Sequence, residues 1–318
     1  MKITFLDRLS FHPDITVRSP NFEHQWVNYD NTSANQVADR CASSQIVVTN
    51  KVEINRQTLE VCQTIKHIAV TATGYNIIDL EACKDHGVSV SNIPSYATTT
   101  VPEHVLNVSL SLYRKLNLYR QLVLQGKWHR SDKFCLFDQP LYDLKGKTFA
   151  VIGFGSLGEA TGRLMHAIGM NVIYNSRFDK NSDFARYADL KTIFNTADVI
   201  SLHCALTEST KDLISFKEFD KMKSSSILVN TARGGIANEQ ATVDAIKNNK
   251  IAGIAFDVLC TEPPTENSSP LFEIADQDNV ILTPHSAWSS QDAMQNLSNT
   301  VIDNIEAFQQ GNPINLVS

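Results

Sequence analysis

The sequence predicts an α/β protein built around two parallel sheets. Short apolar segments alternate with helix-length amphipathic segments along nearly the whole chain, which is the pattern of sheets assembled from βαβ units. The chain has 318 residues, and this length favours two domains with a cleft between them over one typical small core.

The composition is that of a globular protein, with 42% hydrophobic and 19% charged residues. No stretch approaches the roughly 18 apolar residues that a membrane helix needs. The N-terminal segment Met1 to Leu6 is apolar and strand-like and has no basic leader or cleavage site. We therefore expect a soluble, cytoplasmic protein with no membrane partner.

The six cysteines are scattered without a C-x-x-C pair, so we expect reduced thiols, no disulfide framework and no metal site. The net charge is −6 and there is no long basic run, which makes nucleic acid an unexpected partner. A small anionic ligand would need a local cation.

The first part of the chain predicts one small α/β domain. Its apolar runs predict strands at residues 3–6, 46–48, 68–71 and 88–90. Helices are predicted near residues 34–40, 58–62 and 79–86. A break rich in Ser, Thr and Pro follows at residues 94–100.

A long helix is predicted from Thr100 to about Gln125, with Gly126 as its stop. Thr100 and Glu103 have the spacing of a capping box, in which both side chains satisfy free N–H groups at the helix start. Apolar residues on several faces of this helix suggest burial on more than one side, as in a dimer contact.

The second α/β run starts at Lys147 and continues to about His285. Its predicted strands are residues 148–152, 171–174, 199–203, 227–230, 251–257 and 280–283. Six strands match a doubly wound dinucleotide-binding sheet. A last helix, residues 289–308, ends at Gly311 and is expected to return to the first domain.

A glycine-rich turn, Gly153-Phe154-Gly155-Ser156-Leu157-Gly158, follows the strand at 148–152 and precedes a predicted helix at 159–168. In this context Gly153 permits a tight turn, Gly155 lets a pyrophosphate approach, and Gly158 lets helix pack on strand. The helix N-terminus would bind the phosphates. The alternative is a turn that binds nothing. With this motif we expect two Rossmann-like doubly wound domains: a dinucleotide-binding domain, residues 99–287, and a smaller flavodoxin-like substrate domain, residues 1–98 with 288–318.

The second strand of that domain ends at Asn175-Ser176-Arg177, with no carboxylate for the ribose hydroxyls of NAD. Without the acid, Ser176 and Arg177 could bind a 2′-phosphate, so NADP is slightly favoured over NAD. Alternatively, Asn175 still accepts a ribose hydroxyl and Arg177 lies in solvent, which leaves NAD usable.

Three polar segments follow later strands of the same sheet and contain Arg233, Glu262 and His285. Ligands bind at the carboxyl ends of strands in an open α/β sheet, so these residues should converge near the nicotinamide. Each alone is more often a surface or loop residue, and their joint placement carries the prediction.

Reduction of a keto group builds negative charge on its oxygen, and His285 is the candidate acid that protonates it. A carboxylate beside an imidazole favours the charged form, which is the role expected of Glu262. Arg233 could bind a substrate carboxylate in bidentate fashion.

Other candidates for substrate binding are Thr73, Gly74 and Tyr75, which follow a first-domain strand and could offer N–H groups to an anion, or form a simple turn. Trp288 could wall the pocket or pack in the core. Lys51 could add a cation, although a solvent-exposed lysine is the commoner case.

With these residues the chain resembles the D-isomer-specific 2-hydroxyacid dehydrogenases, and within them the glycerate dehydrogenase (hydroxypyruvate reductase) branch. The branch rests on Lys51, Phe134-Cys135 and Ser286-Ala287-Trp288. The family motifs lie at residues 71–76, 99–104, 153–158, 202–207, 230–235, 257–264 and 283–288.

The resemblance implies that Arg233 binds the substrate, that His285 is the proton donor and that Glu262 is the partner of His285. It also implies a homodimer joined through the long helix. Asn175 stands where the family has Asp, which puts NAD preference in doubt, and Ala205 stands where it has Pro. The expected cofactor contacts are Thr100, Gly153, Gly155, Ser156, Leu157, Gly158, Asn175, Ser176, Arg177, His203, Cys204, Thr231, Ala232, Arg233, Asp257 and His285.

The implied activity is NAD(P)H-dependent reduction of a small anionic 2-keto acid, hydroxypyruvate or glyoxylate, to the D-2-hydroxy acid. A larger 2-keto acid is an alternative substrate. A dinucleotide-sensing binding protein on the same fold is the alternative of another class, which the absence of a disordered extension disfavours. Formate dehydrogenase is disfavoured because no Gln precedes His285 as in that enzyme.

Overall fold

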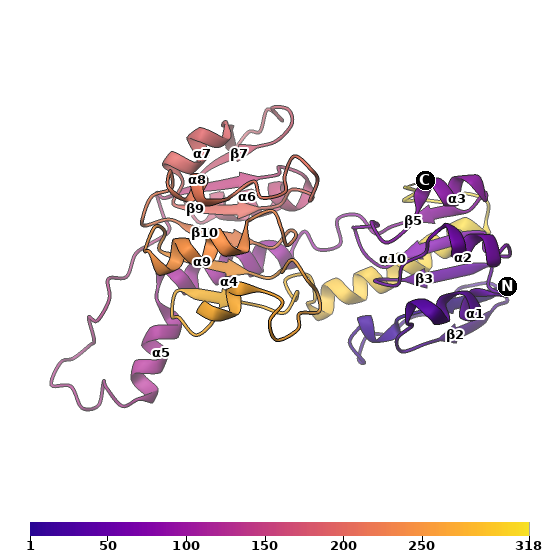
Figure 1. Ribbon diagram of the computed structural model, residues 1–318, viewed down its shortest axis with the longest axis horizontal. Helices are drawn as coiled ribbons and strands as arrows, with labels where there is room; N and C mark the ends of the chain where they lie inside the picture. Colours follow the sequence, from indigo (N-terminus) through magenta and orange to yellow (C-terminus); the bar gives the residue numbers. More distant parts are fainter. Residues whose placement is uncertain (318) are drawn as a thin grey trace. The chain divides into compact units, whose positions relative to one another are not determined.

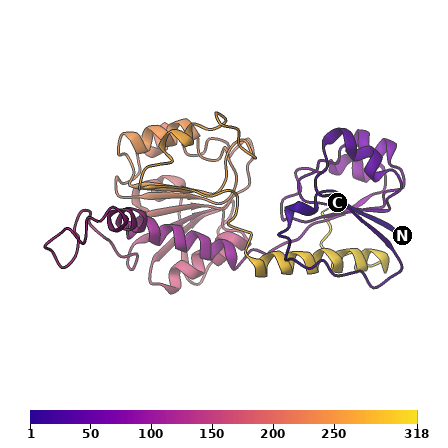
Figure 2. The ribbon, with the colours of Figure 1, turned by 90° about the horizontal axis from the view of Figure 1, so that it is seen from below.

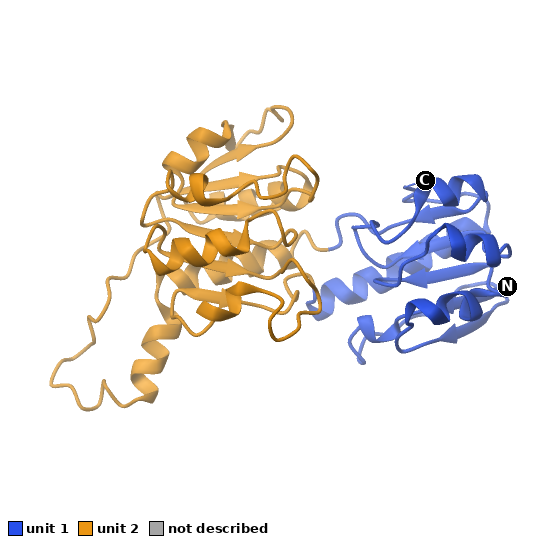
Figure 3. Cartoon of the chain, in the orientation of Figure 1, with its two compact units in different colours: residues 1–96, 289–318 blue, residues 97–288 orange. Residues whose placement is uncertain are grey.

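The computed structural model describes residues 1–317 and consists of two compact units. Unit 1 comprises residues 1–96 and 289–318, and unit 2 comprises residues 97–288 (Figure 3). Each unit contains one sheet, and every strand pair in both sheets is parallel. The prediction of an α/β fold with two parallel sheets is confirmed.

The unit 1 sheet has the order β2-β1-β3-β4-β5 (Figure 1), which is the flavodoxin-like order. The four predicted strands are present, and β2 was missed because this edge strand is only half-buried and has no apolar run. The strands are β1 Lys2–Phe5, β2 Gln25–Asn28, β3 Ile46–Thr49, β4 His67–Val70 and β5 Ser89–Ser91.

Helices cover both faces of this sheet (Figure 2). On one face α1 Val37–Cys41, α2 Arg56–Val61 and α3 Leu80–Asp85 pack over an apolar cluster. On the other face α10 Gln291–Gln309 contacts β4, where His67 stacks on Phe308 with ring centroids 4.5 Å apart. Burial lowers the pKa of His67 to about 4, so this ring packs as a neutral group.

The unit 2 sheet has the order β12-β11-β10-β9-β6-β7-β8. The six predicted strands are present, but the sheet has seven. The prediction missed β8 because it is an exposed edge strand. The strands are β6 Thr148–Ile152, β7 Asn171–Asn175, β8 Ala185–Tyr187, β9 Val199–Leu202, β10 Ile227–Asn230, β11 Gly253–Phe256 and β12 Val280–Leu282.

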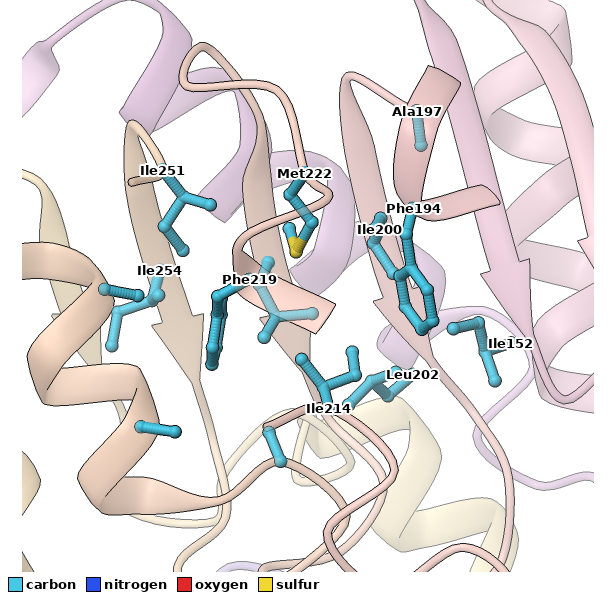
Figure 4. Close-up of a cluster of buried hydrophobic side chains, with 14 of the residues drawn as sticks. Ile152, Phe194, Ala197, Ile200, Leu202, Ile214, Phe219, Met222, Ile251 and Ile254 are labelled. Atoms are coloured by element: carbon cyan, nitrogen blue, oxygen red, sulfur yellow. The ribbon is translucent and has the colours of Figure 1, made fainter. Parts of the chain in front are cut away.

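Two helix layers enclose this second sheet (Figure 2). One face carries α4 Thr100–Tyr113 and α6 Ser156–Ala167, which also contact each other. The other face carries α7 Leu190–Thr196, α8 Phe216–Phe219, α9 Glu239–Lys247 and the 3-10 helix η3 Pro270–Ile274. Ile200, Leu202, Phe194 and Phe219 fill the space between (Figure 4). The sheet is therefore doubly wound, as predicted.

The predicted single helix from Thr100 to Gln125 is wrong, because the chain breaks into α4 and α5 Leu116–Leu124. Lys115 joins them in the left-handed region, with φ +50°. α4 is anchored up to Tyr113, whose hydroxyl donates to Asp198 O at 3.1 Å, whereas α5 has no buried residue and extends away from the body of unit 2 (Figure 1). Packing on the sheet, rather than glycine or proline, sets the break.

The predicted capping box at Thr100 is also not formed. Main-chain carbonyls of the preceding turn take its place: Val101 N donates to Ala97 O and Glu103 N to Thr99 O. The Thr100 hydroxyl instead donates to Ala287 O at 3.2 Å. The start of α4 is thereby tied to the last segment of unit 2.

Within residues 1–317, no helix has both the length and the apolar character required to cross a bilayer.

Candidate active site and dinucleotide site

The glycine-rich turn follows β6 and enters α6 at Ser156. Gly153 has φ +99°, and a Cβ there would lie 2.4 Å from Cys204 N. Only glycine allows the loop after β9 to approach this closely. A Cβ at Gly158 would lie 2.2 Å from Gly153 O and 2.9 Å from a side-chain atom of Val151 in β6. Gly158 thus lets the first turn of α6 pack against the loop and against the strand on which the sequence analysis placed it.

Gly155 differs from its two neighbours in the motif. Its φ is −88°, and a Cβ built there meets nothing within 4 Å. Gly155 and Ser156 are both exposed, at the N-terminus of a helix of 12 residues. The missing side chain therefore leaves open space where N–H groups and the positive end of the helix dipole would meet an anion.

A cavity of about 570 Å³ lies beside this turn, at the carboxyl ends of β6, β7 and β9. Many of the predicted cofactor residues line it together, namely Gly153, Gly155, Asn175, Ser176, Arg177, His203 and Cys204. Burial lowers the pKa of His203 to about 4 and raises the pKa of the Cys204 thiol, so both are neutral at pH 7.

The cavity also has a second cation, Lys180, and an exposed aromatic ring, Phe178, neither of which the sequence analysis singled out. The turn that presents them is organised by Tyr174. Its hydroxyl donates to the carboxylate of Asp179 and accepts a hydrogen bond of 2.8 Å from Lys180 N. A carboxylate engaged in this way leaves Arg177 and Lys180 as the charges lining the cavity.

Asn175 is held by its own amide, since Nδ2 donates to Ala188 O at 2.9 Å. Its Oδ1 remains the atom that can accept from a ribose hydroxyl. The Ser176 hydroxyl donates to Phe178 O within the same turn. The predicted sugar-binding residues are thus at the cavity, with the Ser176 hydroxyl already engaged in the turn.

The other predicted cofactor residues lie outside this cavity lining. Leu157 is in the first turn of α6, and Thr100 starts α4. Thr231 and Ala232 follow β10, and Asp257 follows β11. Thr231 Oγ1 is buried and has no hydrogen-bond partner in the described chain. An unpaired buried hydroxyl costs free energy, so this atom fits a polar group of a bound ligand.

The structure brings His285 and Glu262 together. Nδ1 of His285 donates to Oε2 of Glu262 at 2.6 Å, and the two side chains are 28% and 31% exposed. This assigns the Nδ1–H tautomer and leaves Nε2 to hold a transferable proton. The pair can act as a general acid whose charged form is stabilised by the carboxylate.

The His285 main chain is in the left-handed region, with φ +52°. The buried Asp257 carboxylate secures it by accepting hydrogen bonds from the hydroxyl of Thr283 and the N–H groups of Ser286 and Ala287. His285 N itself donates to Asp257 O at 2.9 Å. Asp257, predicted as a cofactor contact, therefore holds the His285 loop.

Arg233 has an exposed side chain, and its guanidinium donates to Ala232 O at 2.7 Å. The main chain here is fixed by Asn230, which donates to Arg233 O and accepts from Ala232 N. The structure thus fixes the position from which Arg233 projects.

The predicted substrate residues of unit 1 lie in the loop after β4. Thr73 and Tyr75 are exposed, and the Thr73 hydroxyl donates to Ile93 O at 2.9 Å. Trp288, predicted to wall the pocket, is half-buried at the end of unit 2. Lys51 lies in the loop after β3. Asn50 N and Lys51 N both donate to the buried carboxylate of Asp7, which fixes this loop.

Known proteins resemble this chain along its whole length. The model for "D-isomer specific 2-hydroxyacid dehydrogenase, NAD binding domain" matches residues 106–287. Glycerate dehydrogenase of Methylorubrum extorquens is 41% identical over 99% of this chain and 98% of its own. Hydroxypyruvate reductase of Blautia hydrogenotrophica is 33% identical over 100% of both chains. The solved structure of an acyclic imino acid reductase with NADPH and D-Arg has TM-score 0.85 and 25% identity, covering 100% of both chains.

Substitution of two of the three glycines of the turn should have opposite effects. Gly155→Ala should unfold at the same urea concentration as the wild type, because a Cβ there meets nothing within 4 Å. It should bind NADH and NADPH at least ~10-fold more weakly, because its methyl group would enter the space that we expect the pyrophosphate to occupy. Gly158→Ala should unfold at lower urea, since its methyl group meets Gly153 O. Calorimetric titration and urea unfolding measure both effects. Unchanged nucleotide affinity in Gly155→Ala would remove this turn from the binding site.

Proposed function

The chain belongs to the D-isomer specific 2-hydroxyacid dehydrogenase family, and we propose that it reduces hydroxypyruvate to D-glycerate, with glyoxylate as a second substrate. It is an oxidoreductase that uses a nicotinamide dinucleotide and acts on small 2-keto or 2-hydroxy acids. The observation that carries the proposal is the His285–Glu262 pair at 2.6 Å, formed by the loops that follow β12 and β11. The names of the two relatives support the choice of substrate.

The roles follow from the chemistry of the residues. A reduced nicotinamide supplies the hydride when bound. His285 donates the Nε2 proton to the keto oxygen and Glu262 stabilises the imidazolium before transfer. Arg233 binds the substrate carboxylate and polarises the neighbouring carbonyl. Trp288 and residues 73–75 of unit 1 complete our proposed set of substrate-binding residues.

The activity is tested by the initial rate of NADH and NADPH oxidation with hydroxypyruvate, glyoxylate and pyruvate. We expect hydroxypyruvate to react fastest. His285→Ala should lower kcat by about 10²–10⁴-fold, the usual contribution of a general acid, with dinucleotide affinity nearly unchanged. A larger 2-keto acid as the best substrate would refute the substrate proposal, and full turnover in His285→Ala would refute the role of His285.

The charges at the cavity favour NADP over NAD. Arg177 and Lys180 line the cavity, and among residues 1–317 no carboxylate does, so a 2′-phosphate would meet two cations. Charge-assisted hydrogen bonds of this kind contribute roughly 1.5–3 kcal/mol each. Lys180 adds to the preference that Asn175, Ser176 and Arg177 indicated in the sequence.

Removing these cations should therefore change nucleotide choice. Arg177→Ala and Lys180→Ala should each raise the Kd for NADPH by ~10-fold or more and the Kd for NADH by much less. Lys191→Ala, which removes a cation of the neighbouring helix α7 outside the cavity lining, is the control. Equal weakening of both nucleotides would contradict a 2′-phosphate site here.

We propose further that the chain forms a homodimer through α5 and the segment that follows it. These residues extend from unit 2 and expose several large apolar side chains (Figure 1). Leu124 is 64% exposed, Trp128 51%, Phe134 96% and Phe137 79%. Exposed apolar side chains gathered in this way are typical of protein interfaces.

The double variant Phe134→Asp/Phe137→Asp should then be monomeric, because two carboxylates would be buried without partners at the interface. Light scattering after size exclusion measures the mass of the particle. Val61→Asp, which changes an apolar residue of α2 in unit 1 that is 64% exposed, should remain a dimer. A monomeric wild type, or a dimeric double variant, would disprove this interface.

A further inference from the structure

Glu239 is a buried carboxylate that the reaction described above does not use. It is the first residue of α9 and is 8% exposed. The helix does not need it as a cap, because the Asn238 side chain accepts from Ala241 N at 2.9 Å. A buried carboxylate is costly unless hydrogen bonds replace its water, so its partners indicate its role.

Both oxygens of Glu239 bind the segment that runs from β11 to η3. Oε1 accepts from Cys260 N at 2.7 Å, and Oε2 accepts from the hydroxyl of Ser269 at 2.8 Å. Burial, followed by the hydrogen bond to Glu239, raises the pKa of the Cys260 thiol to about 12. Cys260 is therefore a neutral neighbour of this carboxylate and does not act as a thiolate.

The peptide that Glu239 holds leads directly to the acid pair. Leu259 N donates to Oε1 of Glu262 at 2.9 Å, while Oε2 of Glu262 accepts from His285. The N–H groups of two consecutive residues thus bind two carboxylates: Cys260 N binds Glu239 and Leu259 N binds Glu262. Moving this peptide would move both hydrogen bonds.

The residue after Arg233 fixes the same peptide by contact. A Cβ at Gly234 would lie 2.0 Å from Leu259 O and 2.4 Å from Cys260 N. The main chain next to Arg233 therefore packs directly on the peptide between Leu259 and Cys260. Glu239 binds this peptide through hydrogen bonds and Gly234 through packing, which leaves it little freedom to shift.

We propose that Glu239 is a positioning residue for proton transfer: it fixes the Leu259–Cys260 peptide so that Leu259 N holds the Glu262 carboxylate toward His285. This inference rests on the proposed roles of Glu262 and His285. It assigns no contact with the substrate to Glu239. Loss of the carboxylate should weaken the alignment of the acid pair and leave the glycine-rich turn unchanged.

The kinetic test compares Glu239→Ala with Glu239→Gln. Glu239→Ala should lower kcat for hydroxypyruvate about 10-fold, with KM for the dinucleotide changed less than about 2-fold. Glu239→Gln keeps an oxygen that accepts from Cys260 N and should retain most of kcat. Ser269→Ala is the matched control, because it removes the other partner of the same carboxylate and leaves the Cys260 bond in place.

A double-mutant cycle distinguishes positioning from loss of stability. Glu262→Gln alone removes the charge beside His285, and Glu239→Ala acts through the same carboxylate, so the two losses in kcat should not multiply when combined. Both single variants should lower kcat with KM for hydroxypyruvate changed much less, because the lost alignment concerns proton transfer and not substrate binding. Multiplicative losses in kcat, or an equal rise in KM, would show that Glu239 is only structural.

A measurement without turnover keeps this test separate from the proposed substrate. NMR of the imidazole N–H protons in the dinucleotide-free protein, with His285 assigned from the spectrum of His285→Ala, reports the hydrogen bond between His285 Nδ1 and Glu262 directly. The Nδ1 proton signal of His285 should shift or broaden in Glu239→Ala and stay in place in Glu239→Gln and Ser269→Ala. An unchanged signal in Glu239→Ala overturns the inference, whether or not hydroxypyruvate is the substrate.

Discussion

The Asp257 carboxylate, 2% exposed at the end of β11, holds together the part of unit 2 in which proton transfer is proposed. Its hydrogen bonds to Thr283, Ser286 and Ala287 fix the loop on which His285 adopts φ +52°. A left-handed residue other than glycine costs free energy and persists only where its surroundings impose it. The buried carboxylate supplies that constraint. Through Ala287 O the same loop also receives the hydroxyl of Thr100, so the start of α4 depends on it as well.

The segments after β10, β11 and β12, which carry the proposed catalytic residues, support one another. Gly234 packs on the peptide between Leu259 and Cys260. Cys260 N donates to Glu239, Leu259 N donates to Glu262, and Glu262 in turn accepts from His285. A parallel sheet brings these three segments to one edge, but it does not fix the conformation of the loops that carry the side chains. Side-chain hydrogen bonds and one close main-chain contact provide the remaining precision. Proton transfer is sensitive to small displacements, so such a network is where changes distant from the substrate would affect kcat.

The sequence predicted the buried strands, which follow from hydrophobic periodicity, and the residues that follow strand ends, which follow from the parallel order of the strands. Buried strands such as β6 and β10 were found because they are continuous apolar runs, whereas β2 and β8 were missed because edge strands carry half-exposed residues. The break at Lys115 had no glycine or proline to signal it, and the Thr100 hydroxyl found a partner 187 residues away. The pairing of His285 with Glu262 was predicted from strand ends. The role of Glu239 was invisible, because a Glu beginning a helix is ordinary and its buried hydrogen bonds depend on tertiary packing.

Asn175 illustrates how a neutral side chain can set the charge of a site in an acidic protein. The chain carries a net charge of −6, yet the cavity at β7 is lined by Arg177 and Lys180, with no carboxylate among the described residues that line it. Asn175 Nδ2 donates to Ala188 O, and an aspartate at this position could not make that bond. The carboxylate of such an aspartate would face the carbonyl oxygen of Ala188 as well as any 2′-phosphate. The nearby acid, Asp179, is bound by the Tyr174 hydroxyl, which holds its pKa below the usual range. The local positive potential therefore arises from hydrogen bonding of neutral and acidic groups as much as from the two cations.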